Sequence, residues 1–355
     1  MTDATKPDAR TRKRKDEHLA VFAEGKASAR AQTTLFECVH LDHNPLPEMS
    51  LDEIDLSATL AGKKLKAPFM ITGMTGGTDK ARDINRALAK VAQDLGLAMG
   101  LGSQRAMIED PSLAATYEVR DIAPDIFLAG NIGGVQAARY GVDRILEAMK
   151  KTGADACCVH LNPAQEMAQP EGDRDFRGVL ESIKRLVHEL GMPVIVKETG
   201  AGIGLTAAHK LVKAGVEMID VSGVGGSSWV GAEILRNPAE AERMEPFWDW
   251  GTPTAAAVLY AYKQGATVIA SGGIRNGLDA AKAFSMGASL AGIAAPLVQA
   301  FFEGREERMA SLMRTVIDGL KTAMILTGCR TVPEIRSVAK VITEPLSLWI
   351  GRKTK

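Results

Sequence analysis

Short apolar runs alternate with longer amphipathic stretches along the chain from Ala67 onward. The runs have the length of buried strands, the longer stretches repeat their apolar positions with a helical period, and Gly, Pro or Asn bounds each of them. The pattern predicts eight strands, at 67–73, 97–101, 126–131, 154–161, 193–197, 216–221, 267–271 and 288–294. It predicts helices between and after them, at about 79–95, 111–123, 135–151, 176–190, 205–214, 253–264, 277–286 and 296–327.

The order of these elements predicts an α/β fold of the (β/α)8 TIM-barrel class. Parallel strands need crossover helices, and eight such units close a sheet on itself. A doubly wound open sheet with an accessory domain is the alternative, and the total of eight favours the barrel. We expect residues 1–66 to form an N-terminal extension, 67–330 the barrel and 331–355 a C-terminal helical segment.

Charge and cysteine content narrow the range of partners. The 43 basic and 43 acidic residues cancel, so no overall field favours nucleic acid or an anionic membrane, and any anion site must be local. The 4 cysteines include no CxxC pair, and adjacent Cys157 and Cys158 would lie on opposite faces of a strand, which indicates reduced packing residues. No signal-peptide core and no run near the ~20 apolar residues of a membrane helix is present, so we expect a soluble, cytoplasmic protein.

Residues 160–166 place an imidazole, two amides and a carboxylate directly after the apolar run 154–159. Catalytic groups of such barrels lie at the carboxyl ends of the strands, so this stretch predicts a polar pocket for an anion and a metal. Glu166 suits Mg²⁺ held by one carboxylate, with phosphate and water completing the coordination. The alternative is the start of a surface loop. His160 is the one histidine at a predicted strand end, although a lone histidine is more often structural.

The other predicted strand ends are also polar or rich in glycine. They are the segments 72–77, 102–105, 131, 197–198, 222–227, 272–275 and 294–295. Residues 271–277 follow the seventh strand and 292–296 follow the eighth, where barrels build phosphate sites from glycine N–H groups and a nearby cation such as Arg275. Ordinary turns would explain either segment alone, but both together favour a phosphate site.

Lys197 ends the apolar run 193–196, where a lysine in the barrel mouth is costly unless an anion pairs with it. A salt bridge to Glu198 is one explanation. The functional alternatives are a cation that stabilises a cofactor ring and a Schiff-base lysine. Together with the phosphate site and Asn131, the cofactor role is favoured.

Two further segments have two interpretations each. The basic run 10–15 stops at an acidic pair and His18, then continues into a helix-compatible stretch, so it is either a solvated tail or a clamp for a diphosphate. By composition alone we favour the tail. The longest predicted loop, 223–251, suits a lid over an apolar ligand, while Trp248 and Trp250 equally suit an oligomer contact.

Together these residues resemble the FMN-dependent type 2 isopentenyl diphosphate isomerase family, from about Arg14 to Ala295. The resemblance implies that Arg14, Lys15 and His18 clamp the substrate diphosphate, which reverses the tail interpretation. It implies substrate-side roles for Asn162, Ser103 and Arg105, catalytic roles for His160, Gln165 (also a substrate contact) and Lys197, and Mg²⁺ on Glu166. It implies FMN contacts for Thr72, Gly73, Met74, Thr75, Ser103, Asn131, Lys197, Ser222, Ser227, Gly272, Gly273, Arg275, Ala294 and Ala295.

The resemblance also implies an activity, the interconversion of isopentenyl and dimethylallyl diphosphates in isoprenoid biosynthesis. Reduced FMN would act as acid and base without net redox change, with NADPH as its reductant, in a homo-oligomer such as a tetramer or octamer. The chain departs from the family at 223–229, where Val224 and Ser227 replace the common Arg and Thr. Serine keeps the hydroxyl, whereas the charge of the arginine is lost.

Two other functions compete with this one. A flavin-dependent 2-hydroxy-acid oxidase would share the barrel and the Gly-Gly-Xaa-Arg motif. Such enzymes resemble one another in carrying a catalytic histidine at the end of a late strand, whereas this chain has no histidine after His209. A non-catalytic phosphate-binding scaffold would need neither the 160–166 cluster nor Lys197.

Overall fold

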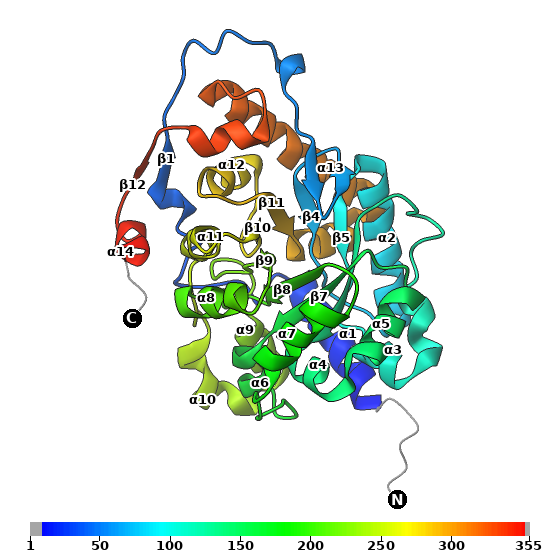
Figure 1. Ribbon diagram of the computed structural model, residues 1–355. Coiled ribbons are helices and arrows are strands. Elements are labelled where there is room, and N and C mark those ends of the chain that lie inside the picture. The colour runs from blue at the N-terminus through cyan, green and yellow to red at the C-terminus, as the bar shows by residue number, and fades with distance from the viewer. Residues whose placement is uncertain (1–8, 352–355) are drawn as a thin grey trace, which may run out of the picture.

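The computed structural model describes residues 9–351, with side chains from Arg14 onward, and contains a closed barrel of eight parallel strands (Figure 1). Neighbouring strands follow one another in chain order around the barrel, and the last strand pairs with the first. The prediction of a (β/α)8 barrel is confirmed, because each predicted strand region contains one strand. The strands are β4 (Phe69–Ile71), β5 (Ala98–Gly100), β6 (Leu128–Gly133), β7 (Ala156–Leu161), β8 (Val194–Glu198), β9 (Met218–Asp220), β10 (Thr267–Ala270) and β11 (Leu290–Ile293).

Helices surround the barrel and connect its strands (Figure 1). Six of them lie where the helical period predicted them, and α2 shows the local signals expected at both helix ends. Thr78 caps α2 by accepting the N–H of Ala81, and Gly96 ends it in the left-handed conformation. These helices are α2 (Asp79–Leu95), α7 (Val179–Glu189), α8 (Leu205–Lys213), α11 (Thr254–Lys263), α12 (Gly277–Ser285) and α13 (Ala295–Thr327).

Two predicted helices differ from the structure, and a third contains a kink. The helix expected at 111–123 is wrong, because Pro111 follows the short α3 (Arg105–Glu109) and begins the 3-10 helix η3 (Pro111–Thr116). The helix expected at 135–151 is divided into α4 (Gly134–Tyr140) and α5 (Val142–Lys151). Gly141 separates them with a φ of 76°, a value that an α-helix cannot contain. Helix α13 is kinked at Gly304 and Arg305.

The structure also contains helices that the sequence pattern did not predict. The segment expected to be a long loop contains α9 (Trp229–Arg236), whose first turn is capped by Ser228, and then further short helices. At the N-terminus, α1 (Ala9–Ala23) replaces the solvated tail, and it packs against α9 and α13. The remaining short helices are α6 (Pro163–Ala168), α10 (Ala241–Met244), α14 (Leu346–Ile350), η1 (Phe36–Cys38), η2 (Leu51–Glu53), η4 (Pro238–Glu240), η5 (Glu245–Phe247) and η6 (Val332–Ser337).

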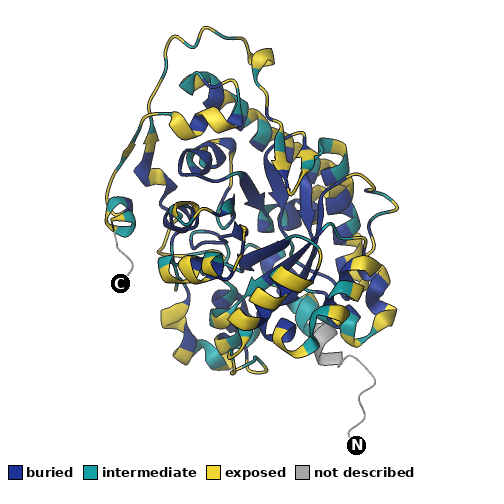
Figure 2. Ribbon diagram, viewed as in Figure 1, coloured by how far each residue is buried: buried dark blue, intermediate teal, exposed yellow. Residues whose placement is uncertain are grey.

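The core has two layers, because each barrel strand is buried on both faces, as the dark strands of Figure 2 show. One apolar cluster fills the barrel interior and includes Cys158, Met70 and Phe127. A second and larger cluster lies between strands and helices and includes Cys157. The two adjacent cysteines therefore do lie on opposite faces of β7, and all four cysteines are unpaired and buried. Burial of each large apolar side chain contributes about 1.5–3 kcal/mol.

Segments outside the eight βα units close one end of the barrel and pair a strand before the barrel with a strand after it. The hairpin of β2 (Ala58–Leu60) and β3 (Lys63–Leu65) inserts Leu60 and Leu65 into the interior cluster. Strand β1 (Val39–Leu41) pairs antiparallel with β12 (Lys340–Ile342). No helix between residues 9 and 351 is long and apolar enough to cross a membrane.

Candidate active site

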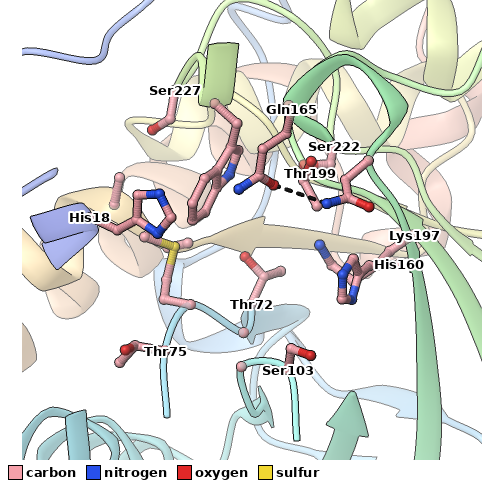
Figure 3. A pocket seen from close by; sticks show the side chains of 18 of the residues that line it. His18, Thr72, Thr75, Ser103, His160, Gln165, Lys197, Thr199, Ser222 and Ser227 are labelled. Carbon is pink, nitrogen blue, oxygen red and sulfur yellow. Dashed lines mark hydrogen bonds between the residues drawn. The ribbon is translucent and has the colours of Figure 1, made fainter. Parts of the chain in front are cut away.

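A cavity of about 1400 Å³, including its open mouth, lies at the carboxyl ends of the barrel strands. Helix α1 and the first turn of α9 border it (Figure 1), and Figure 3 shows the side chains of His18, Gln165 and Lys197 pointing into it from different elements. Every residue predicted to contact substrate, cofactor or metal lines this one cavity: Arg14, Lys15, His18, Thr72, Gly73, Met74, Thr75, Ser103, Arg105, Asn131, His160, Asn162, Gln165, Glu166, Lys197, Ser222, Ser227, Gly272, Gly273, Arg275, Ala294 and Ala295.

Backbone from β10 and β11 forms one end of the cavity. Gly272 and Gly273 have φ values of 93° and 87°, and a Cβ on Gly273 would lie 2.3 Å from Cγ2 of Thr34, so only glycine fits there. Ala295 begins the 33-residue helix α13, in whose first turn Leu297 and Val298 donate their N–H groups to the carbonyl of Ala294. Among the described residues Arg275 forms no salt bridge, and its Nη1 donates to the carbonyl of Ile274 at 3.3 Å. A glycine turn, a helix N-terminus and a guanidinium without a salt-bridge partner make this end suitable for a phosphate.

Lys197 is buried, with 6 % of its surface exposed, and its Nζ donates to the backbone oxygen of Glu198 at 2.7 Å. The predicted alternative, a Lys197–Glu198 salt bridge, does not form. The Glu198 carboxylate instead accepts the N–H groups of Thr199 and Gly200 at 2.6 Å each. Across the sheet Lys197 is in register with His160 on β7 and with Asp220 on β9. The cation therefore lies among neutral and anionic groups at the cavity floor.

His160 is held as a neutral ring. Its Nδ1 lies 2.8 Å from Oδ1 of Asn131, while Nδ2 of Asn131 donates to the carbonyl of Leu101 at 3.0 Å. Because the amide nitrogen is used by Leu101, the amide oxygen accepts and Nδ1 of His160 carries the proton. Burial, with the charge of Lys197 adding to it, lowers the pKa of His160 to about 3. Nε2 is therefore a hydrogen-bond acceptor at neutral pH.

The amides of α6 and its N-cap are ordered by a hydrogen-bond chain. Nδ2 of Asn162 donates to Oε1 of Gln165 at 3.1 Å and to Oε1 of Glu166 at 3.0 Å. Oε2 of Glu166 accepts the N–H of Asp173 at 2.7 Å. Nε2 of Gln165 donates to Oε1 of Glu233 at 3.1 Å, which fixes the orientation of the Gln165 amide.

Glu233 connects several residues of the site, and the sequence analysis missed it. Its side chain is fully buried, and Oε1 lies 2.9 Å from Nε2 of His18. Oε2 accepts a hydrogen bond from Nε of Arg236 at 2.8 Å, and Nη2 of the same guanidinium forms an ion pair with Oε2 at 2.8 Å. The side-chain nitrogen of Gln169 donates to Oε1 of Glu233 at 3.1 Å, and the side-chain oxygen of Gln169 accepts a hydrogen bond from Nη1 of Arg14 at 2.6 Å. Burial alone would raise the pKa of Glu233, but His18, Arg236 and Gln165 outweigh it and lower that pKa.

Three cations gather at the mouth of the cavity. Nζ of Lys15 donates to the hydroxyl of Tyr117 at 3.0 Å, and that hydroxyl donates to the carbonyl of Ser103 at 2.7 Å. Burial, together with the charges of Arg14 and Arg105, lowers the pKa of Lys15 to about 7. Nη1 of Arg14 is 3.9 Å from the nearest carboxylate oxygen, on Glu171. Arg105 is paired with Glu109 at 2.9 Å, whereas Lys15 is held by neutral groups and Arg14 lies at a longer distance from its carboxylate. Three neighbouring cations of this kind indicate a site for a ligand with several negative charges.

A metal site built from protein groups alone is absent from residues 9–351, since no three His, Cys, Asp or Glu side chains are placed to hold an ion. Among the described residues that line the cavity, Glu166 is the one that carries a carboxylate. A hard cation bound there would take its other ligands from water and from a bound phosphate.

Position 224 does not contribute to the cavity. Val224 is buried and bridges to Pro253, whereas Ser227 lines the cavity and pairs with Ser28. The sequence analysis also missed Phe22 and Trp229, which line the cavity, and Tyr117, which holds Lys15. The position of Phe22 could have been predicted from its spacing, because it lies four residues after His18 and therefore on the same face of the helix.

The relation to known proteins agrees with this geometry. The family model for FMN-dependent dehydrogenases matches residues 8–161 and 146–341. An isopentenyl-diphosphate delta-isomerase from Pyrococcus furiosus is 45% identical over 355 residues, covering 97% of this chain and 90% of the relative. The protein of that name from Methanosarcina barkeri is 43% identical over 349 residues, covering 97% and 95%.

Solved structures of mandelate oxidase share the fold. The enzyme with (S)-2-phenylpropionate superposes with a TM-score of 0.64 at 18% identity, covering 94% of this chain and 98% of that chain. A variant of mandelate oxidase gives a TM-score of 0.66 at 19% identity, covering 94% and 99%. At identities this low, the superposition shows that the two proteins share the barrel fold, and it carries no information about a shared activity. The sequence relatives decide the family: the chain belongs to the FMN-dependent isopentenyl-diphosphate delta-isomerases.

Proposed function

We propose that this chain interconverts isopentenyl and dimethylallyl diphosphates in isoprenoid biosynthesis, with FMN, Mg²⁺ and NADPH. One observation carries the proposal: a single cavity combines a phosphate-type backbone cradle at one end, neutral polar groups at its floor and three clustered cations at its mouth. A mononucleotide cofactor and a small diphosphate account for both anion sites. A scaffold that binds one phosphate accounts for only the first.

The residues present fit FMN. The backbone at Gly272 and Gly273, the start of α13 and Arg275 would hold its phosphate, and Lys197 would face its ring from the cavity floor. When bound and reduced, FMN supplies a ring nitrogen that can donate and accept a proton, and NADPH supplies the reducing equivalents. The further flavin contacts in this proposal are Thr72, Gly73, Met74, Thr75, Ser103, Asn131, Ser222, Ser227, Ala294 and Ala295.

The diphosphate would bind at the mouth. Arg14, Lys15 and Arg105 supply positive charge from two sides, and a planar guanidinium suits bidentate contact with phosphate oxygens. Glu166, already oriented by Asn162 and the backbone of Asp173, would hold Mg²⁺ against the same phosphates. His18 and Ser103 complete the substrate contacts in this proposal.

The proton transfers need polar groups whose orientation does not change during the reaction. The Gln165 amide is held between Asn162 and Glu233, and the neutral ring of His160 is held by Asn131. They would orient the alkene and limit its motion, while the charge of Lys197 favours negative charge nearby. Helix α1 at the mouth, together with a bound diphosphate, would limit the access of water to a reacting alkene.

The test supplies the protein with FMN, NADPH, Mg²⁺ and isopentenyl diphosphate without oxygen. We expect dimethylallyl diphosphate to form with many turnovers for each NADPH consumed, because reduction is needed once and the reaction has no net redox change. Stoichiometric NADPH consumption without that product would instead establish a redox flavoenzyme. Protein that binds no added FMN would reject both.

Three parts of the proposal concern organisation. Residues 1–66 would supply the substrate clamp, 67–330 the FMN-binding barrel and 331–355 a separate C-terminal segment.

The protein would act in the cytoplasm as a tetramer or octamer. The exposed pair of Phe247 and Trp250, with ring centroids 5.9 Å apart, supports an oligomer contact there. Trp248, in contrast, is buried under Arg30, so its expected part in such a contact is wrong. Light scattering of the purified protein measures the oligomer size.

A further inference from the structure

One face of α1 changes from charged to apolar along its length. Lys15, Leu19 and Phe22 have the spacing i, i+4 and i+7, so they lie on one side of the helix, and all three line the cavity. The helix rises about 10 Å from Lys15 to Phe22. A ligand whose diphosphate is held at Lys15 and whose hydrocarbon group lies along this apolar face would reach toward Phe22.

An aromatic pair closes the apolar end of this face. Phe22 is 3 % exposed, and its ring meets the indole of Trp229 with centroids 4.7 Å apart and planes inclined by 64°. Two small residues, Ala27 and Ala232, lie buried in the same apolar cluster as Phe22. Removal of the Phe22 ring would therefore enlarge the compartment, because these small neighbours cannot fill the vacated space.

The backbone holds this wall in place. Nε2 of Gln299 on α13 donates to the carbonyl of Phe22 at 3.2 Å. The N–H of Ser228 donates to the carbonyl of Ala27 at 2.7 Å, and the hydroxyl of Ser228 caps the helix that begins at Trp229. Both members of the pair are thus fixed to the barrel, and neither can move far to admit a longer ligand.

We propose that Phe22, packed against Trp229, limits the hydrocarbon group of the substrate to five carbons. The inference rests on the proposed isomerase function and adds the residue that sets the substrate class. The head of the ligand is held by the cations, the end wall is fixed about two helical turns away, and a prenyl group longer by one isoprene unit would overlap the buried ring.

The test compares two probes, dimethylallyl diphosphate and ten-carbon geranyl diphosphate, on holoenzyme with FMN and Mg²⁺. We expect the wild type to bind the ten-carbon probe much more weakly. Phe22→Ala should narrow the ratio of the two dissociation constants by at least about tenfold, because shape exclusion in an apolar pocket is of that order. Phe22→Leu should narrow it partially. Val21→Ala, on the same helix but away from the cavity, should leave the ratio unchanged.

Each result decides the matter. The inference fails if wild-type protein binds both probes equally well, or if Phe22→Ala retains FMN and leaves the ratio unaltered. If Phe22→Ala loses FMN or does not fold, the Phe22→Leu ratio decides in its place. Wild-type holoenzyme that neither binds nor isomerises the five-carbon diphosphates would overturn the proposed function itself, a result separate from an unchanged ratio in an active isomerase.

Discussion

The low pKa of Lys15 predicts that diphosphate affinity falls as pH rises above 7. Burial, with the charges of Arg14 and Arg105 adding to it, lowers that pKa from 10.5 to about 7. A bound diphosphate would supply the missing negative charge and raise the pKa again. Above pH 7 the free protein has lost the Lys15 proton and the complex has kept it, so binding takes up one proton.

The size of the effect follows from this difference. The apparent dissociation constant should rise about tenfold for each pH unit above 7, until the pKa of the complex is reached. Between pH 7.5 and 9.0 we therefore expect a rise of roughly 10- to 30-fold. Stability of the ligand-free protein changes in the opposite sense. Between pH about 7 and 10.5 the folded state binds fewer protons at Lys15 than the unfolded state does. The contribution of Lys15 to the free energy of unfolding therefore increases as pH rises through that window.

Titration calorimetry of the FMN-loaded protein with dimethylallyl diphosphate measures both quantities. Buffers of different ionisation enthalpy at pH 8 report the proton uptake directly. At this pH phosphate groups are fully ionised and ordinary histidines are neutral, so neither adds to the slope. Lys15→Met should weaken binding at pH 7.5 and remove the pH dependence. Lys26→Met, a change of a lysine whose side chain is 65% exposed, should retain it.

Two results would refute this reasoning. Wild-type affinity that stays constant between pH 7.5 and 9.0, without proton uptake, would mean that Lys15 does not contact the diphosphate or is protonated throughout. An unchanged slope in Lys15→Met would assign the titration to another group.

Three further predictions follow from the site. Glu233→Ala leaves His18, Gln165 and Arg236 without their shared acceptor, so the free energy of unfolding in a denaturant titration should fall by about 3–5 kcal/mol, and Glu233→Gln should lose less; equal losses would mean that the charge is unimportant. Gly273→Ala adds about 1–2 kcal/mol of backbone strain and a Cβ 2.3 Å from Thr34, so FMN retention on gel filtration should drop sharply, whereas Gly62→Ala, with a similar φ and open space around it, should retain FMN. Glu166→Gln should weaken the dependence of activity on Mg²⁺ while the protein keeps its bound flavin, as measured by flavin absorbance. Simultaneous loss of flavin would mean that this carboxylate contacts the flavin and not the metal.

Local sequence signals predicted the barrel well and its irregular helices poorly. Short continuous apolar runs, typical of strands buried on both faces, differ clearly from amphipathic stretches with a helical period, and this is why the eight strand regions agree with the structure. The breaks at Pro111 and Gly141 were also present as local signals, but the apolar period continued across them and concealed them. Helix α9 was missed because glycines and short polar residues precede it, although Ser228 has the position of an N-cap.

The sequence by itself determined which groups reach the cavity from the strands, because in a parallel barrel every carboxyl end points to the same face. Only the tertiary structure decided how those groups are paired. His18 and Glu233 meet across 215 residues, and Lys15 and Tyr117 across 102, distances along the chain over which no periodicity carries information. The basic segment has the composition of a solvated tail, and it forms part of the site because α1 finds an apolar surface on α9 and α13. Burial then changed the chemistry of its lysine, since desolvation depends on what surrounds a charge and not on its neighbours in sequence.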